Sequence, residues 1–378
     1  MKIAKFTLNG YSNYGNVLQN YALQQILLRY AESVDTIWHT AENLCPLYWW
    51  KEKFGYGKWK NYIKFIINWH NSRSRILSGY WGMEMVRQGK IKDWCDRNIY
   101  SRHISFEALP SIGNEYDYFV VGSDQVWNPY FFQSDEELQS YFLNFAPKGK
   151  RIAYAASISV PEIPASKYNT FLNGLKGMDC ISMREQAGAD LVQRLTGKSV
   201  PTLVDPTLLL SSEKWDNVSR LPSWYRGQKY ILTYFLGARP TNVLEKLHKD
   251  LGLEVVNLLD TSCYDYYVTG VDEFISAIKN ASLVYTDSFH GTVFSILYRR
   301  PFVVCDRIPL NSRDNVGGKM NSRIDTLLHL FGLENRRGTQ TNNYSIVHPL
   351  SLEYPDIDSI LQQQHQRSNQ FLSNALGC

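Results

Sequence analysis

The sequence lacks the features that would place a chain in a membrane or in an oxidising compartment. No apolar run approaches the roughly 20 residues of a membrane-spanning helix, and the opening MKIAKFTLNGYSNYG contains no apolar segment typical of a signal peptide. The six cysteines show no Cys-x-x-Cys spacing: Cys45, Cys95, Cys180, Cys263, Cys305 and Cys378. We therefore expect a cytoplasmic chain with reduced thiols, without disulfides and without a bound metal.

The sequence also has little net charge. Forty Lys and Arg against 36 Asp and Glu leave a formal charge of +4, which is too small to indicate a nucleic-acid partner. A hydrophobic content of 44% and a charged content of 20% are typical of a folded globular protein. A chain of 378 residues exceeds what one hydrophobic core usually organises, so two domains are expected.

Short apolar strands alternate with helical patterns along most of the chain. The strands predicted in the first half include 2–8, 118–121, 151–157, 180–183 and 202–204, and those in the second include 230–235, 254–258, 283–286 and 302–305. Such alternation predicts an α/β fold with parallel sheets in both halves. The polar stretch 211–229 suggests an N-terminal domain over 1–215 and a C-terminal domain over 216–350, with a closing helix in 351–378.

Acidic residues are scarce between residues 48 and 75, where Glu52 is the one acid among many Trp, Tyr, Lys and Arg residues. This stretch belongs to a segment of different composition, about 46–100, which we interpret as a helical insertion in the first domain. Its aromatic side chains are expected to pack on that domain. Docking on an anionic membrane surface is a second interpretation, and stacking on nucleic acid is the least favoured.

The strongest chemical signal is Thr286-Asp287-Ser288-Phe289-His290-Gly291-Thr292, at the end of an apolar strand and the start of a helix. Asp287 or Ser288 is placed to cap the helix. The first helical turn suits a phosphate or carboxylate, Gly291 lets a ligand approach the backbone, and His290 can neutralise an anion or transfer a proton. A structural turn whose histidine bonds nearby backbone is the plainer interpretation.

Several motifs together resemble the polysaccharide pyruvyl transferase family. They are Asn9–Tyr21 (NGYSNYGNVLQNY), Gly122–Asn128 (GSDQVWN), Ser182–Glu185 (SMRE), Asp205-Pro206 and Ala281–Val304, in the order and with the gaps of that family. The resemblance implies two Rossmann-like domains facing a cleft, as in GT-B glycosyltransferases. It also implies phosphoenolpyruvate as co-substrate, no cofactor, and a pyruvate ketal on a sugar as product.

The resemblance assigns the donor site to a histidine and basic residues, which places His290 and Arg184 there together with Ser288, Gly291 and Thr292. Many members carry arginine two residues before the histidine, where this chain has Ser288. A hydroxyl does not replace a bidentate guanidinium. The candidate substitutes are Arg239, Arg313, Lys319 and Arg323.

Acceptor binding is expected at two turns that follow strands. Asn13, Tyr14, Gly15 and Asn16 precede the first helix, and Ser123, Asp124 and Gln125 follow the strand at 118–121. Asp124 is also a candidate base, with a turn or cap as an equally good interpretation. Asp205 is interpreted as a turn residue at a strand end.

The predicted function is therefore transfer of a pyruvyl group from phosphoenolpyruvate to a sugar of a surface or capsular polysaccharide precursor, with His290 as the acid. The acceptor could be lipid-linked, and the chain could work at the inner face of the membrane. A GT-B glycosyltransferase that uses a nucleotide sugar, or a catalytically silent saccharide-binding protein, are the alternatives. The sequence does not indicate an oligomeric state.

Overall fold

The computed structural model of the protein describes residues 1–40, 79–132, 134–309, 322–338 and 348–378. The stretch 48–75, and with it most of the predicted insertion, lies outside these residues. No helix in the described ranges combines the length and apolar character needed to cross a bilayer.

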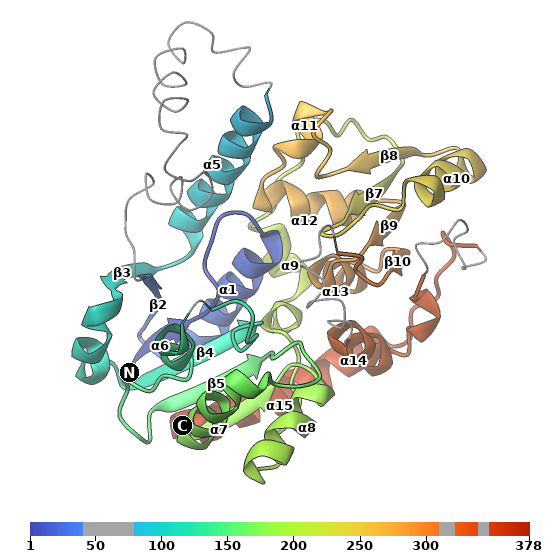
Figure 1. The fold of residues 1–378 in the computed structure, drawn as a ribbon. Helices are drawn as coiled ribbons and strands as arrows, with labels where there is room; N and C mark the ends of the chain where they lie inside the picture. The colour runs from blue at the N-terminus through green and yellow to red at the C-terminus, as the bar shows by residue number, and fades with distance from the viewer. Residues whose placement is uncertain (41–78, 133, 310–321, 339–347) are drawn as a thin grey trace, which may run out of the picture.

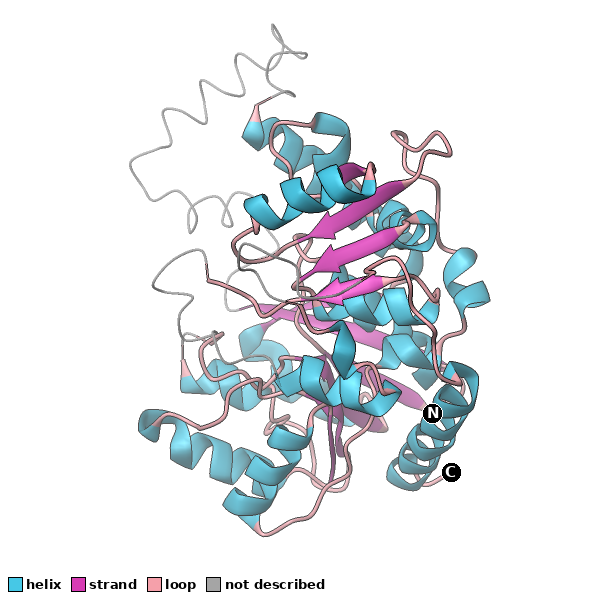
Figure 2. Ribbon diagram, turned by 90° about the vertical axis from the view of Figure 1, so that its right-hand side faces the viewer, coloured by secondary structure: helices cyan, strands magenta, loops and turns pink. Residues whose placement is uncertain are grey.

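The strands form two sheets, and every pairing within them is parallel. The first sheet consists of β1 (Lys2–Phe6), β2 (Ser33–Thr40), β3 (Ser101–Ser105), β4 (Tyr118–Asp124), β5 (Arg151–Ala156) and β6 (Cys180–Met183). The second consists of β7 (Tyr230–Tyr234), β8 (Glu254–Asn257), β9 (Leu283–Thr286) and β10 (Phe302–Val304). Figure 2 shows the two sheets with helices on both faces.

The strand order explains where ligands can bind. The first sheet runs β3-β2-β1-β4-β5-β6, which is the Rossmann order, and the second runs β10-β9-β7-β8. The order reverses between β1 and β4 in the first sheet and between β7 and β9 in the second. Ligands of open parallel sheets bind beyond the carboxyl ends of the strands at such reversals, because the loops diverge there. The fold is thus GT-B-like, as predicted, with two Rossmann-like halves.

Helices cover both faces of each sheet because neighbouring residues of each strand are buried in opposite directions. They are α1 (Tyr14–Leu27), α5 (Tyr80–Asn98), η2 (Phe106–Asn114), α6 (Asp135–Ser140), η3 (Ala165–Lys167), α7 (Tyr168–Gly177), α8 (Gln186–Thr196), η4 (Pro206–Leu209), α9 (Ser212–Asp216), α10 (Thr241–Leu251), α11 (Tyr264–Tyr267), α12 (Val271–Asn280), α13 (Phe289–Leu297), α14 (Ser322–Phe331), η6 (Glu334–Arg336) and α15 (Ile357–Leu376). In the first sheet, Val120 packs toward α1, whereas Phe119 and Val121 pack toward η2, α6 and α7.

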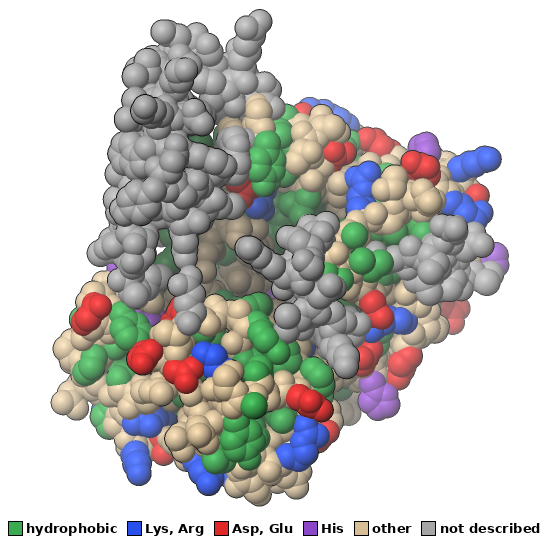
Figure 3. All heavy atoms as spheres, viewed as in Figure 1, with side chains coloured by type: hydrophobic (Ala, Val, Ile, Leu, Met, Phe, Trp, Pro, Cys, Tyr) green, Lys and Arg blue, Asp and Glu red, His purple; other side chains and the backbone are tan. Residues whose placement is uncertain are grey.

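One hydrophobic cluster joins the two halves. It contains Leu18 of α1 and Val120 of β4 as well as Phe274 of α12 and Val293 of α13. Figure 1 shows α1 beside α12 and α13 at the junction of the halves. The two carboxyl edges are therefore held face to face by a continuous apolar interface. Figure 3, in the same view as Figure 1, shows a recess between the halves. Positive and negative side chains are interspersed over the surrounding surface.

The C-terminal helix α15 returns to the first sheet. The Tyr154 hydroxyl of β5 donates to Ser368 Oγ at 3.1 Å, and His365 Nε2 lies 3.2 Å from the Leu208 carbonyl oxygen. Leu372 and Leu376 are buried in the shared cluster. The chain thus crosses between the halves twice, and α15 fills the face of the first sheet beside α1.

Some predicted boundaries differ from the structure. The first helix begins at Tyr14 rather than Val17, because Asn13 caps it by accepting from Gly15 N. Residues 202–204 form an isolated bridge from Thr202 to Met183 instead of a strand. The polar stretch 211–229 contains the short helix α9, and neither β2 nor β3 was predicted.

A buried histidine at the end of β2 makes stability depend on pH. His39 is 5% exposed, its Nε2 lies 2.8 Å from Ser140 Oγ, and burial lowers its pKa to about 4. In the unfolded chain its pKa is about 6.5, so the unfolded state binds more protons between pH 6.5 and 4. Folding stability should therefore fall as pH drops through this window, by about 3 kcal/mol in total for this group.

Urea denaturation at pH 7 and pH 4.5 measures this effect. His39→Gln keeps a polar partner for Ser140 but does not titrate, so its loss of stability on acidification should be smaller than that of wild type by about 2–3 kcal/mol. His248→Gln changes an exposed histidine and should behave as wild type. Equal acid sensitivity of wild type and His39→Gln would show that His39 does not carry the effect.

Candidate active site

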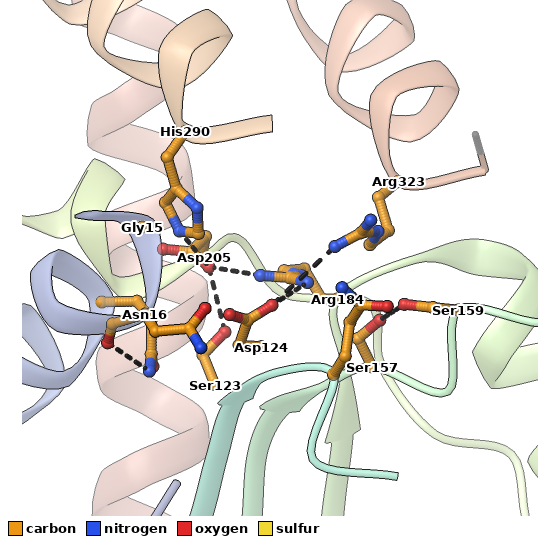
Figure 4. Close-up of polar contacts among 12 residues, drawn as sticks. Gly15, Asn16, Ser123, Asp124, Ser157, Ser159, Arg184, Asp205, His290 and Arg323 are labelled. Carbon is orange, nitrogen blue, oxygen red and sulfur yellow. Dashed lines mark hydrogen bonds and ion pairs between the residues drawn. The ribbon is translucent and has the colours of Figure 1, made fainter. Parts of the chain in front are cut away.

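The two reversal points of the sheets bring one cluster of ionisable side chains together (Figure 4). From the first half come Asp124 at the end of β4, Arg184 directly after β6, and Asp205 at the start of η4. His290 comes from the first turn of α13, and Arg323 comes from the first turn of α14. All five are at least nine-tenths buried, with exposures between 1% and 6%.

Arg184 joins the two aspartates. Its Nη1 donates to Asp205 Oδ2 at 2.8 Å and its Nη2 donates to Asp124 Oδ1 at 3.0 Å. Its guanidinium lies 4.6 Å above the ring of Phe289, the residue before His290. The guanidinium is thus fixed by one half of the molecule while it contacts the other.

Asp205 is the hub of the cluster. Oδ1 caps η4 by accepting from the amide and hydroxyl of Thr207, at 3.1 and 2.7 Å. Oδ2 accepts from Arg184 and, at 3.0 Å, from Ser123 Oγ. Asp205, predicted to be a turn residue at a strand end, caps η4 and also contacts His290. The position of Asp205 in the sequence, far from His290, did not indicate this contact.

His290 faces this carboxylate. Its Nε2 lies 3.5 Å from Asp205 Oδ2 and makes no hydrogen bond with any described residue. On its other side the ring rests on Gly15 of α1, where an added Cβ would lie 2.2 Å from Nδ1. A buried imidazole nitrogen beside a carboxylate, without a hydrogen-bond partner of its own, is available to a ligand.

The charges in the cluster shift one another's pKa values. Burial opposes ionisation of Asp205, but His290 and Arg184 outweigh it and hold its pKa well below the usual range. Burial likewise opposes ionisation of Asp124, and Arg184 and His290 again outweigh it and lower its pKa. Burial and the neighbouring Arg184 lower the pKa of Arg323 to about 9, since its nearest cluster carboxylate, Asp124 Oδ1, lies 3.8 Å away. Both aspartates are therefore ionised at neutral pH.

A buried glutamate supports the loop after β5. Glu185 Oε1 accepts from Ser157 Oγ at 3.0 Å and from the amides of Ile158 and Ser159 at 3.0 and 3.2 Å. The residue follows Arg184 directly, so this carboxylate fixes the backbone that presents the guanidinium. This role of Glu185 was not predicted from the sequence.

The predicted donor residues on α13 have mainly structural roles. Of the two predicted caps, Ser288 is the one used: its Oγ accepts from Gly291 N at 3.2 Å. Asp287 instead accepts from the amides of Leu236 and Gly237. The Thr292 hydroxyl donates back to the Ser288 carbonyl, and a Cβ on Gly291 would lie 3.0 Å from Thr286 Oγ1.

The candidate substitutes for the absent arginine fall in three places. Arg323 lies in the cluster, whereas Arg239 is exposed in the loop after β7 and makes none of the contacts that tie the cluster together. Arg313 and Lys319 lie outside the described residues. Of the four, Arg323 alone is placed by the structure beside Arg184 and Asp124.

Some of the predicted acceptor residues have structural roles, and others are half-buried near the cluster. Tyr14 is fully buried, and its hydroxyl donates to the Thr269 carbonyl of the second half at 2.6 Å, so it holds the halves together and is not free for a sugar. The Asn13 side chain caps α1. Asn16 and Gln125 are half-buried, and in Figure 4 Asn16 lies opposite Ser123. Ser123 is fully buried, and its hydroxyl donates to Ala155 O and Asp205 Oδ2 at 3.0 Å each, so Asn16 and Gln125 are the more accessible of the predicted acceptor contacts.

A cavity of about 420 Å³ opens on the α14 side of the cluster. Its walls include apolar side chains of residues 203–208, α14 and Phe289, and Arg184, Asp205 and Arg323 are among its lining residues. Among the described residues, no three His, Cys, Asp or Glu side chains are grouped so as to hold a metal ion.

The sequence profile of the polysaccharide pyruvyl transferase family matches residues 13–308, a span that contains Asp124, Arg184, Asp205 and His290. The chain belongs to this family. Arg323 lies beyond the matched span. No curated protein matches the chain significantly.

Several solved structures are similar to this chain at low sequence identity. They include an alpha-glucosyltransferase in complex with UDP (9% identity, 99% of this chain and 95% of that chain covered, TM-score 0.41). Others are a UDP-GlcNAc 2-epimerase from Neisseria meningitidis bound to UDP-GlcNAc (10%, 97% and 100%, 0.39) and the E. coli ADP-heptose lps heptosyltransferase II (12%, 100% and 98%, 0.32).

The contact between Gly15 and His290 predicts a sensitive position. Gly15→Ala would force His290 away from its place, because the added Cβ meets the ring at 2.2 Å. A displacement of this size is expected to lower the transferase rate about 10-fold to 100-fold. Gly89→Ala on α5 meets nothing within 4 Å and serves as the control, with an unchanged rate. Full activity of Gly15→Ala, measured by phosphate release, would contradict the assigned position of His290.

Proposed function

We propose that this chain transfers a pyruvyl group from phosphoenolpyruvate to a saccharide of a surface or capsular polysaccharide precursor, forming a pyruvate ketal. The observation that carries the proposal is the His290 imidazole, buried beside the Asp205 carboxylate where both carboxyl edges meet, with an Nε2 that bonds to none of the described residues. Membership of the pyruvyl transferase family supports the reaction class.

The donor needs positive charge for its phosphate and carboxylate. His290 lies in the first turn of α13, so the positive end of the helix dipole is close to the cluster and favours an oxyanion. Arg184 adds a fixed guanidinium held between Asp124 and Asp205. Because these groups are already in place and shielded from water, they stabilise a leaving phosphate without reorganisation.

His290 is our candidate to protonate C3 of phosphoenolpyruvate, because its imidazole lies at the junction of the halves with Nε2 3.5 Å from the Asp205 carboxylate. A sugar hydroxyl then bonds to C2 and gives up its proton, for which Asp124 is our candidate acceptor. As the C2–O bond to phosphate breaks, the leaving phosphate takes the proton held by Asp124, and a second hydroxyl bonds to C2 while its proton returns to His290. The two hydroxyl protons thus end on C3 and on the released phosphate.

Asp124 is ionised, as a base must be, but its ion pairs with Arg184 limit its basicity. Its main contribution in this scheme is to position Arg184. Asn16 and Gln125 are our candidates for contacts with the acceptor. A lipid-linked acceptor and a cytoplasmic location at the inner face of the membrane belong to the proposal and rest on residues 48–75 of the sequence.

The test is phosphate release from phosphoenolpyruvate by the full chain, with and without a panel of simple and lipid-linked glycosides, together with mass spectrometry of the acceptor. Acceptor-dependent release with a matching gain of mass supports the proposal. Turnover of a nucleotide sugar in place of phosphoenolpyruvate would identify a glycosyltransferase. Saccharide binding without turnover of either donor would identify a silent binding protein.

A further inference from the structure

The cavity beside α14 contains two buried guanidinium groups with unused hydrogen-bonding capacity. Arg323 is 6% exposed and Arg184 is 3% exposed, and both line the cavity. The Nε–H of each makes no hydrogen bond with any described residue. Buried donors are almost always paired in folded proteins, so these two guanidinium groups, which both line one cavity, are under-satisfied without a ligand.

The charges around Arg323 also favour an anionic ligand. Its nearest cluster carboxylate is Asp124, at 3.8 Å, and that carboxylate already accepts from Arg184 at 3.0 Å. Burial and the repulsion of Arg184 lower the pKa of Arg323 to about 9, and the nearby carboxylates of Asp124 and Glu185 do not offset them. An oxyanion between the two guanidinium groups would relieve both effects.

The walls limit the size and kind of the ligand. Leu203, Leu327 and Phe289 are among the apolar side chains that line the cavity, whose volume is about 420 Å³. Small-molecule sites range from about 300 to 1,000 Å³, so this cavity lies at the compact end. Apolar walls also strengthen an ion pair at the floor, because they exclude water from it.

We infer that Arg323 and Arg184 form an oxyanion site at the floor of this cavity and bind the carboxylate of phosphoenolpyruvate. The assignment of the ligand rests on the proposed function; the oxyanion site itself does not. A planar guanidinium pairs with a carboxylate through two parallel hydrogen bonds, which fixes the orientation of the three-carbon unit. The phosphate then lies toward the first turn of α13, and Arg323 acts as a specificity-determining residue for the donor.

The experiment compares Arg323→Gln, Arg323→Lys and wild type by isothermal titration calorimetry with three probes: phosphoenolpyruvate, pyruvate and inorganic phosphate. Arg194→Gln is the matched control, because Arg194 is an exposed arginine of α8 that is not among the residues lining the cavity. We expect Arg323→Gln to weaken phosphoenolpyruvate binding at least 10-fold, Arg323→Lys to recover part of it, and Arg194→Gln to stay within about twofold of wild type. Inorganic phosphate should bind wild type and Arg323→Gln alike.

Thermal unfolding without ligand separates this role from a structural one. A buried arginine that stabilises the fold lowers the melting temperature when it is removed, whereas an arginine with unmet hydrogen bonds does not. Arg323→Gln should therefore melt no lower than wild type while binding the donor more weakly. Leu330→Trp, which narrows the cavity without changing either arginine, should also weaken donor binding.

The outcomes distinguish the two proposals. Unchanged phosphoenolpyruvate affinity in Arg323→Gln, or an equal loss for inorganic phosphate, would overturn the carboxylate assignment while leaving pyruvyl transfer standing. No phosphoenolpyruvate binding by wild type would overturn the proposed function and the ligand assignment. In that case, pyruvate binding to wild type that is lost in Arg323→Gln would still establish the oxyanion site. If wild type does not bind pyruvate, or if Arg323→Gln binds it as well as wild type does, the oxyanion site is overturned.

Discussion

Replacing His290 by alanine is expected to lower the acceptor-dependent rate of phosphate release by about 100-fold to 10,000-fold. The imidazole is the group in the cluster that can donate a proton near neutral pH, and it faces the Asp205 carboxylate at 3.5 Å. The loss should fall on kcat, because the proton is transferred in the transition state. Donor affinity should change less, since Arg184 and the helix terminus remain.

His248→Ala is the control for this substitution. It removes an exposed histidine of α10 that lies outside the cluster, and its rate should equal that of wild type. Steady-state kinetics and circular dichroism of the three proteins separate chemistry from folding. A His290→Ala protein that is folded and within about threefold of the wild-type kcat would refute the role of His290 as the acid, since general acid catalysis contributes far more.

Replacing Arg184 by glutamine is expected to destabilise the protein by about 3–5 kcal/mol and to abolish activity. The substitution leaves Asp124 and Asp205 buried, close together and without their shared cation. In wild type the pKa values of both aspartates are lowered, so their stabilising contribution is present above pH about 3.9 and is lost as pH falls below it. In the variant these buried carboxyls favour the protonated form. The difference in unfolding free energy between wild type and the variant should therefore shrink on acidification.

Urea denaturation at pH 7 and pH 4 tests this expectation. Arg194→Gln, which changes an exposed arginine of α8, should stay within about 0.5 kcal/mol of wild type at both pH values. Arg184→Gln combined with Asp205→Asn should be more stable at pH 7 than Arg184→Gln alone, because one unpaired charge is removed. A deficit that is small or independent of pH would show that the three-residue ion pair contributes little to stability.

The sequence predicted the fold where local patterns are strong. The apolar runs before Asp124 and Asp287 lie at the centres of the two sheets, so their strands were recognised directly. Strands β2 and β3 lie toward one edge of the first sheet, and β3 alternates between exposed and half-buried residues over Ser101–Ser105. Such strands carry too few apolar residues to stand out from a loop.

The site was predicted in part for a similar reason. His290 and Arg184 follow strands directly, and this placement is visible in the sequence. The roles of Asp205 and Tyr14 depend on the docking of segments that are far apart. Tyr14 donates to Thr269, 255 residues away, and Asp205 meets a histidine of the other half. No local sequence pattern indicates contacts over such separations. For this reason Asp205 was predicted only as a turn residue, and Tyr14 was predicted to bind a sugar although it lies in the interface between the halves.

The return of α15 to the first sheet has a consequence for synthesis on the ribosome. The partners of α15, including Tyr154 of β5 and Leu208, are made before the whole second sheet, and α15 is made after it. During synthesis, the face of the first sheet that α15 covers therefore stays exposed until α15 has been made. Other chains and chaperones can contact this apolar surface in the meantime. Its native packing is completed only when Leu372 and Leu376 arrive, so the timing of translation and of folding are linked in this protein.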